Sequence, residues 1–285
     1  MKTGAQGRGM PGRGGLAWTA VGAACAVVLV VLWAAPLLWA LSTALRPEPE
    51  TVSATFHWLP QVWTLNAFAE TLAAGNLVLW LFNSFLVAFL VTVVTMAISL
   101  MAAYAFSQLR FRGRNLVFGV AMLGFLLPFE ALLVPLFRTM NALGLINTYA
   151  GIVLPQVVAP VVIYVFKQFF DGIPADYREA ATLDGAGPLR VLWSVYLPLS
   201  GNIVWAMAIV TFIGAWNNFL WPFIVVTSNE MMTIPLGLTQ TYDAFGVRYA
   251  QLMAGALLGA LPVALAYVVF QRRVTQGFLA AGGLK

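Results

Sequence analysis

Charged residues are scarce in this sequence. Only 9% of its 285 residues are Asp, Glu, Lys or Arg, whereas 61% are hydrophobic and the mean hydropathy is +0.87. Soluble domains average about 25% charged residues, and a water-facing surface needs charges of both signs spread across it. The composition therefore excludes an ordinary soluble globular protein and indicates that lipid is the main solvent of this chain.

Cysteine and histidine are almost absent. The single cysteine, Cys25, allows no intramolecular disulfide, and we interpret it as a small buried or lipid-facing side chain. The single histidine, His57, has no partner for a metal site and is expected at the surface beside Trp58 and Trp63. The phosphate-binding motif G-x-x-x-x-G-K-[ST] is missing as well. We therefore expect no catalytic residue, no metal site and no cofactor on this chain, and no nucleotide hydrolysis by it.

Long intervals without charge separate the few charged clusters. Each interval can hold a transmembrane helix, which needs about 20 apolar residues. Six spans are expected, at about residues 16–41, 78–105, 115–137, 148–169, 202–227 and 250–271. The first is longer than the apolar core of a signal peptide, about 7–15 residues, so we expect it to be retained. Residues 1–15 are expected to form a flexible cytoplasmic tail before a transmembrane domain over 16–285.

The basic residues predict the orientation. Six spans place twelve of the fifteen Lys and Arg residues on one face and three on the other, and cytoplasmic loops retain such residues. The three exceptions are Arg46, Arg138 and Arg248. Both termini are therefore predicted to be cytoplasmic, and the basic charge needs no nucleic-acid partner.

One polar segment, 171–200, separates the fourth and fifth spans on the predicted cytoplasmic side. Pro174 suits the first turn of a helix, which we expect over Ala175–Leu183 and to stop at Asp184 and Gly185. A second short helix is expected over Leu189–Tyr196, ended by Pro198. Together they predict a compact knob on this face.

This segment resembles the EAA loop of ABC-importer permeases. The resemblance consists of Glu179, Ala180, Ala181, Asp184, Gly185, Leu197 and Pro198, with Val195 where that family usually has isoleucine. Further stretches resemble the carbohydrate-uptake branch, the maltose-type second permease subunit, among them "NSFLVAFL", "AAYAFSQLRFRGRN", "GLINTYAGIVLP" and "WNNFLWPFIV". The tail resembles the family ending without its usual final glycine.

The resemblance implies an all-helical type I importer permease that transports a sugar across the cell (cytoplasmic) membrane. It implies a second homologous permease subunit, two cytoplasmic ATPase subunits that bind ATP and Mg, and an extracytoplasmic solute-binding protein. Its loop would dock into a cleft of the ATPase and transmit closure to the membrane helices. Segments 46–76 and 228–249 would then form the external docking surface.

Polar residues at membrane depth are candidates for the substrate path. Trp216, Asn217 and Asn218 sit near an expected bend before Pro222, where an aromatic face and amides could hold a neutral polyol. Asn83 and Ser84 are further candidates. For all of these polar residues, hydrogen bonding between helices is the alternative. Glu130 is expected to reach water, or to pair with Arg138 if Pro135 breaks the helix, in a structural or gating role.

Three other functions remain open at this stage. The same machinery could import glycerol-3-phosphate or another non-sugar solute, although a phosphate favours Arg or Lys in the pathway and none lies near mid-membrane here. A secondary transporter would often show intramembrane ionisable relays or inverted repeats. An intramembrane enzyme would need a His or Cys partner for a buried serine.

Overall fold

The computed structural model describes residues 13–53, 55, 57–243 and 246–281. The expected tail, 1–15, lies outside these residues except for its last three. The chain divides into two compact units, Met1–Glu70 with Arg248–Leu257, and Thr71–Val247 with Leu258–Lys285. We describe each unit by itself.

The first unit is built from helices near both ends of the chain. It contains α1 (Arg13–Ala44), α2 (Glu48–Thr51), most of α3 (Asn66–Ala73) and the start of α15 (Tyr249–Ala281). Its small core consists of Ala44, Ala67, Ala250 and Ala254. Alanines let these helix backbones approach closely. Arg248 forms an ion pair with Glu70 in the same unit.

Helix α1 is apolar along its length. Its segment Val21–Ala44 is long and hydrophobic enough to cross a membrane, and none of its most apolar window is buried within this chain. Cys25 is exposed on it, which agrees with the lipid-facing interpretation. After α1, the chain folds back and the buried Arg46 donates hydrogen bonds to Ser42 Oγ (3.1 Å) and to the carbonyl of His57 (2.5 Å). Trp58 and Trp63 are largely exposed, as expected of interfacial side chains.

The second unit holds most of the helices. In chain order they are α4 (Asn76–Gln108), α5 (Arg114–Leu126), α6 (Phe129–Ala142), α7 (Tyr149–Val153), η1 (Leu154–Gln156), α8 (Pro160–Asp171), α9 (Ala175–Leu183), α10 (Pro188–Val191), η2 (Leu192–Tyr196), α11 (Leu197–Leu199), α12 (Gly201–Trp216), α13 (Leu220–Val225), η3 (Asn229–Met231), α14 (Ile234–Gly237) and η4 (Leu238–Gln240). Two short strands, β1 (Tyr242–Asp243) and β2 (Gly246–Val247), pair antiparallel.

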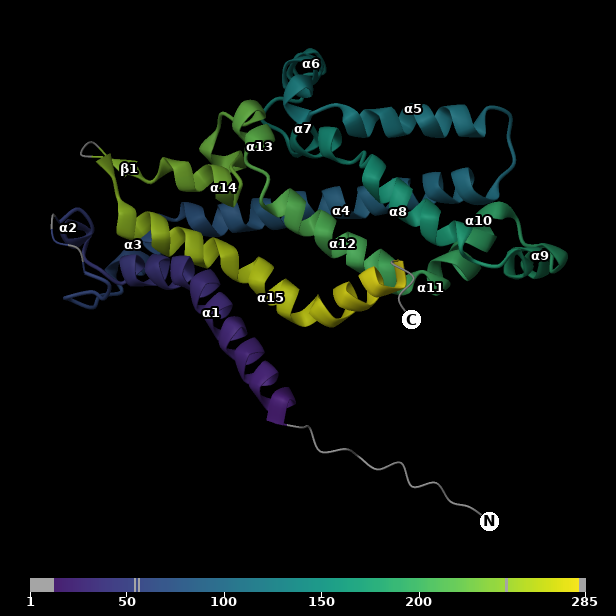
Figure 1. Ribbon diagram of the computed structural model, residues 1–285. Coiled ribbons are helices and arrows are strands. Elements are labelled where there is room, and N and C mark those ends of the chain that lie inside the picture. The colour runs from purple at the N-terminus through teal and green to yellow at the C-terminus, as the bar shows by residue number, and fades with distance from the viewer. Residues whose placement is uncertain (1–12, 54, 56, 244–245, 282–285) are drawn as a thin grey trace. The chain divides into compact units, whose positions relative to one another are not determined.

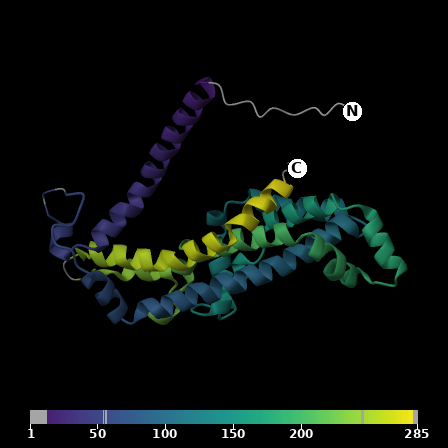
Figure 2. The same cartoon turned by 90° about the horizontal axis from the view of Figure 1, so that it is seen from below.

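Helices α4, α8 and α12 form the centre of the second unit and lie side by side (Figures 1 and 2). Helix α4 is apolar on every side, as expected of a helix covered by neighbours and lipid. Its first half belongs to a hydrophobic cluster with α7, α13 and α14, and its second half to another with α8, η2 and α12. Helix α4 therefore connects the two clusters.

Three of the six expected spans are long continuous helices, in α1, α4 and α15. The third and fourth expected spans are each a pair of helices that pass the same length and hydropathy test together but bend by 102° (α5 and α6) and by 49° (α7 with η1, and α8). A further pair, Pro188–Leu199 and α12, bends by 86° and overlaps the fifth expected span, 202–227, only in α12. The helix is interrupted before Pro222, because α12 ends at Trp216 and α13 begins at Leu220.

The third expected span, 115–137, is interrupted at Pro128 rather than at Pro135. Leu127 is extended (φ −80°, ψ 120°), the conformation to which a following proline restricts its neighbour. Helix α6 starts immediately after Pro128 and continues through Pro135. The condition for an ion pair between Glu130 and Arg138 is therefore not met. Glu130 lies exposed in the first turn of α6, where the helix dipole favours a negative charge.

Gly237 packs against the ring of Trp80, and a Cβ atom there would overlap several ring atoms. We expect Gly237→Ala to destabilise the protein by about 1–3 kcal/mol, the usual cost of overpacking. Gly214→Ala is the matched control, because a Cβ at Gly214 in α12 has no atom within 4 Å. Thermal unfolding of the purified complex in detergent measures both, and equal unfolding temperatures for the two variants would contradict the packing explanation.

Candidate functional site

The segment that resembles the EAA loop contains the helix that was predicted for it. Helix α9 covers Ala175–Leu183 after Pro174, as expected. Gly185 has φ +79°, a left-handed conformation that ends the helix without steric cost. The amide of Ala186 then donates to the carbonyl of Ala181 (3.0 Å), which closes the turn.

The second helix of the segment differs from its prediction. It begins at Pro188 and continues through Pro198 to Leu199 as α10, η2 and α11, so Pro198 does not end it. The middle part, Leu192–Tyr196, is a π-helix. Such a wide turn accommodates an irregularity in the backbone hydrogen bonds, and here it ends two residues before Pro198, which lacks an N–H. The helix ends at Ser200, and α12 starts after an 86° bend.

The outer side of this segment is exposed and carries both charge and apolar area. Glu179, Ala180, Asp184, Gly185 and Pro198 are exposed, while Ala181 and Leu197 are half-buried. A cavity of about 490 Å³ is lined by Arg178, Glu179, Thr182 and Leu183. Leu183 is 89% exposed. A large apolar side chain beside an unpaired carboxylate is the kind of surface that a protein partner covers.

The inner side of the segment packs on the central helices. Tyr196 is fully buried and makes edge-to-face contacts with Tyr104 of α4 (ring centroids 5.2 Å apart) and Phe170 of α8 (5.3 Å). Burial raises the pKa of the Tyr196 phenol, and the Arg178 guanidinium partly opposes this shift. Its hydroxyl has no hydrogen-bond partner among the described residues. Displacement of segment 171–200 therefore moves the Tyr196 ring, which packs against both α4 and α8.

Polar contacts tie the same segment to the end of α4. Arg178 Nη1 donates to the carbonyl of Gln108 (2.8 Å), and Gln108 Nε2 donates to the carbonyl of Phe170 (3.1 Å). Ser107 Oγ donates to the Asp171 carboxylate (2.6 Å), which also pairs with Lys167 (2.6 Å). The segment is thus attached to α4 and α8 by side chains on both.

Asn83 and Ser84 hold the loop after α13 against α4. Asn83 is fully buried, and its Nδ2 donates to the carbonyls of Glu230 and Met232, both at 2.8 Å. Its Oδ1 accepts from the Tyr149 hydroxyl (2.6 Å). Ser84 Oγ accepts from the amide of Ile234 (2.7 Å). At these two residues the structure favours the packing alternative over an open substrate path.

The three residues at the bend after α12 have different surroundings. Trp216 is buried against Phe212. Asn217 is exposed, and within the described part of the chain its side chain donates to the carbonyl of Ile213 in its own helix alone (2.9 Å). Asn218 is half-buried and donates to Gln156 Oε1 (2.6 Å). Of the polar candidates for the substrate path, Asn217 is therefore the one whose side chain faces outward.

Segment Tyr149–Gln156 organises this region, and sequence reasoning assigned it no role. Tyr149 contacts Asn83, Gln156 contacts Asn218, and the carbonyl of Gly151 accepts from Nε1 of the fully buried Trp221 (3.0 Å). The quoted stretch "GLINTYAGIVLP" contained these residues, but only the fold shows what they hold. Asn83 and Tyr104 are 21 positions apart on α4, about 32 Å along a helix, so this region and the exposed loop lie at opposite ends of α4.

No group of three or more His, Cys, Asp or Glu side chains is arranged to hold a metal ion in the part of the chain that the structure describes.

Comparisons with known proteins agree with these features. A family described as binding-protein-dependent transport system inner membrane component matches residues 95–276. The arabinooligosaccharides transport system permease protein of Halalkalibacterium halodurans is 35% identical over 253 residues, 88% of this chain and 90% of the relative. The sulfoquinovosyl glycerol transport system permease protein of Agrobacterium fabrum is 36% identical and covers 91% and 92%. The sn-glycerol-3-phosphate transport system permease protein of Yersinia enterocolitica is 34% identical and covers 70% and 72%.

A solved structure shares the fold. It is the crystal structure of a bacterial ABC transporter involved in the import of the acidic polysaccharide alginate. One of its chains matches with a TM-score of 0.82 at 21% sequence identity, over 93% of this chain and 99% of that chain.

Proposed function

The chain belongs to the family of binding-protein-dependent transport system inner membrane components, and we propose that it is the permease subunit of an importer for a sugar or an oligosaccharide. The observation that carries this proposal is the exposed segment 171–200, whose inner side packs into the same hydrophobic cluster as α4, α8 and α12. Force applied to such a segment reaches three membrane helices through direct contact.

We propose a topology of six spans with both termini in the cytoplasm. The proposal assigns one span to each of the long helices α1, α4 and α15, and one each to the bent regions 115–137, 148–169 and 202–227. The distribution of Lys and Arg supports this orientation, because twelve of fifteen then lie inside. The distance of about 32 Å between Asn83 and Tyr104 supports it as well, since a bilayer core is about 30 Å thick.

The proposed partner proteins are inferred from the family and from the exposed segment 171–200. We propose that two cytoplasmic ATPase subunits dock on Glu179, Leu183 and Pro198 of this chain and the matching surface of a second, homologous permease. ATP and Mg would bind the ATPases. An extracytoplasmic solute-binding protein would deliver the solute at the segments 46–76 and 228–249. Alternating access would then expose the path to one side at a time.

The substrate class is inferred from relatives and from residues at the bend. Two of the relatives named above are, by their names, permeases for arabinooligosaccharides and for sulfoquinovosyl glycerol, and only the first of these solutes is a neutral sugar. In this chain the exposed Asn217 offers an amide to a neutral polyol. The alternative substrate is glycerol-3-phosphate or a similar anion, and a third relative is, by its name, a permease for sn-glycerol-3-phosphate. It would need cations in the path, which the second permease would have to supply.

Copurification tests the coupling part of this proposal. The chain, expressed with its partner genes and purified through a tag on itself, is expected to carry an ATPase subunit and to import solute in proteoliposomes only with ATP and the binding protein. Uptake by the chain without any ATPase subunit would instead establish a secondary transporter. A panel of sugars and sugar phosphates offered to the binding protein then separates the two substrate classes.

A further inference from the structure

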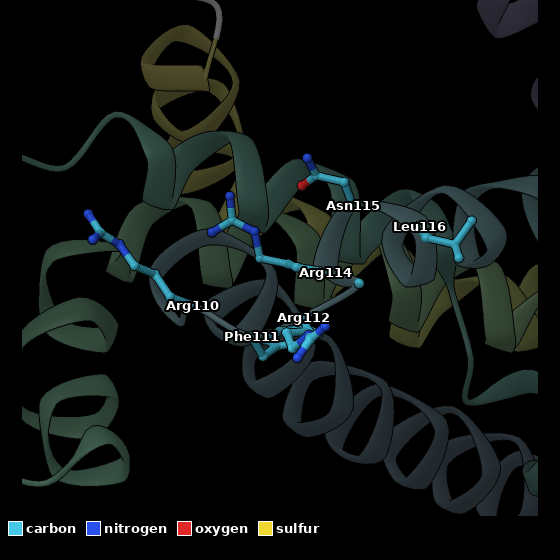
Figure 3. A pocket seen from close by; sticks show the side chains of 7 residues that line it. Arg110, Phe111, Arg112, Arg114, Asn115 and Leu116 are labelled. Atoms are coloured by element: carbon cyan, nitrogen blue, oxygen red, sulfur yellow. The ribbon is translucent and has the colours of Figure 1, made fainter.

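The loop between α4 and α5 gathers three cations in five residues. Arg110, Arg112 and Arg114, together with Phe111 and Leu116, line an open cavity of about 650 Å³, and Figure 3 shows the three arginine side chains extending from the loop in different directions. Ligand pockets usually measure about 300–1,000 Å³, so this cavity is large enough for a headgroup-sized molecule. The loop lies outside the segment assigned to the ATPase and outside the region of Asn83 and Asn217.

Two of the three arginines are available to a ligand. Arg114 donates to the carbonyls of Ser107 (3.4 Å) and Leu109 (3.2 Å), so it holds the loop in place. Arg110 and Arg112 are exposed, and neither guanidinium has a hydrogen bond or ion pair among the described residues. The nearest acid of α8, Asp171, is already engaged by Lys167 and Ser107. The cavity therefore carries uncompensated positive charge.

An apolar stripe begins at the same loop. Leu116, Val120 and Leu123 are 73%, 60% and 59% exposed, and their spacing of four and three residues places them on one face of α5. None of the residues of α5 is buried within this chain. A cation cluster at one end of an exposed apolar stripe matches a molecule with an anionic head and a hydrocarbon chain.

We propose that this loop and the adjoining face of α5 bind an anionic phospholipid. Arg110 and Arg112 contact its phosphate, and its acyl chain lies along Leu116, Val120 and Leu123. Guanidinium groups pair well with phosphate, and each Lys or Arg near a membrane surface contributes about fivefold in affinity for anionic lipid, or about 1 kcal/mol. A soluble phosphate would leave the apolar stripe unused. The side of the membrane rests on the proposed topology, but the binding itself does not.

Photocrosslinking of lipid to the intact importer tests this site. The complex is placed in nanodiscs with a phosphatidylglycerol that carries a diazirine on its acyl chain, or with the same acyl chain on phosphatidylcholine. Trypsin releases the peptide 115–138, which contains α5, and mass spectrometry gives the ratio of phosphatidylglycerol to phosphatidylcholine adducts on it. We expect a ratio of at least about fivefold in the unmodified protein.

Matched variants separate this site from general surface charge. Arg110→Gln and Arg112→Gln should each lower the ratio severalfold, and the double variant should bring it close to one. The doubly substituted Arg110→Lys, Arg112→Lys protein should retain a preference. Arg190→Gln, which removes an exposed arginine of segment 171–200, should leave the ratio unchanged.

Several results would overturn the proposal. An equal loss in Arg190→Gln would mean that the charge of the whole face attracts the lipid. Loss of the preference in excess inorganic phosphate, against chloride at the same ionic strength, would identify a soluble anion as the ligand. Absence of adducts from both lipids on peptide 115–138 would mean that protein covers this face. Each readout is independent of transport, so the lipid site and the import function stand or fall separately.

Discussion

Glu179→Arg is expected to abolish ATP-driven import by the assembled transporter. Glu179 is exposed on α9 and has no hydrogen bond or ion pair among the described residues, so its replacement should change the stability of this chain by less than about 0.5 kcal/mol. The loss should therefore come from docking. Truncating one partner of a charge pair that an interface buries costs about 2 kcal/mol or more, about thirtyfold in affinity, and reversal of the charge adds repulsion.

Two measurements follow this variant. The amount of ATPase subunit recovered with the tagged chain should fall at least about thirtyfold in dilute conditions, and uptake in proteoliposomes should fall with it. Glu179→Gln should lose less, because it removes the charge without adding repulsion. Arg138→Glu reverses an exposed charge on α6, outside the segment, and serves as the control. Full uptake by Glu179→Arg with a normal ATPase content would refute the assignment of this loop.

The exposed loop could be predicted from sequence because its signals are local. Pro174 and Gly185 mark the two ends of α9 by backbone chemistry alone, and the helix has the predicted bounds. Pro198 shows the limit of the same reasoning. A proline usually ends a helix, but the π-helix before it widens the backbone, and nothing in the sequence announces such a turn.

The two prolines near the third expected span make a similar point. Pro128 breaks the helix and Pro135 does not, although both lie in apolar surroundings. At Pro135 the carbonyl of the proline accepts from Thr139 Oγ1 (2.9 Å) within a continuous helix. Thr139 is local in sequence, but neighbouring helices also decide which interruptions are tolerated in membrane helices, and those helices are not local in sequence.

The polar candidates for the substrate path differ in their surroundings, and distant parts of the chain cause this difference too. Asn83 and Asn217 are both asparagines in apolar stretches, and their surroundings in sequence do not separate them. The partners of Asn83 are 66 to 149 residues away, whereas Asn217 bonds within its own helix. Their residue type made both asparagines candidates for the substrate path, but only the fold shows that Asn83 is enclosed and Asn217 is exposed.

Asn83→Leu is expected to destabilise the protein by about 2–4 kcal/mol. Leucine has the same branched heavy-atom skeleton as asparagine, but it leaves the carbonyls of Glu230 and Met232 and the hydroxyl of Tyr149 without their partner. The bond to Met232 is buried and its unsatisfied carbonyl costs about 1–3 kcal/mol, whereas the other two bonds are part-buried and cost about 0.5 kcal/mol each, the low end for a hydrogen bond. The loop that carries Ile234 should also exchange its amide hydrogens faster, because it loses its main attachment to α4 while the bond from Ile234 to Ser84 remains.

Asn217→Leu is the matched control, since it replaces the same residue type at an exposed position. Its unfolding temperature should stay near that of the unmodified protein, while its import rate should fall if its amide lines the path. Thermal unfolding and uptake, measured on both variants in the same reconstituted complex, therefore give opposite patterns for a structural amide and a path amide. A stable Asn83→Leu protein with weakened solute selectivity would reverse this assignment and return Asn83 to the substrate path. The loss of buried hydrogen bonds that hold a loop against α4 must lower the stability of the protein.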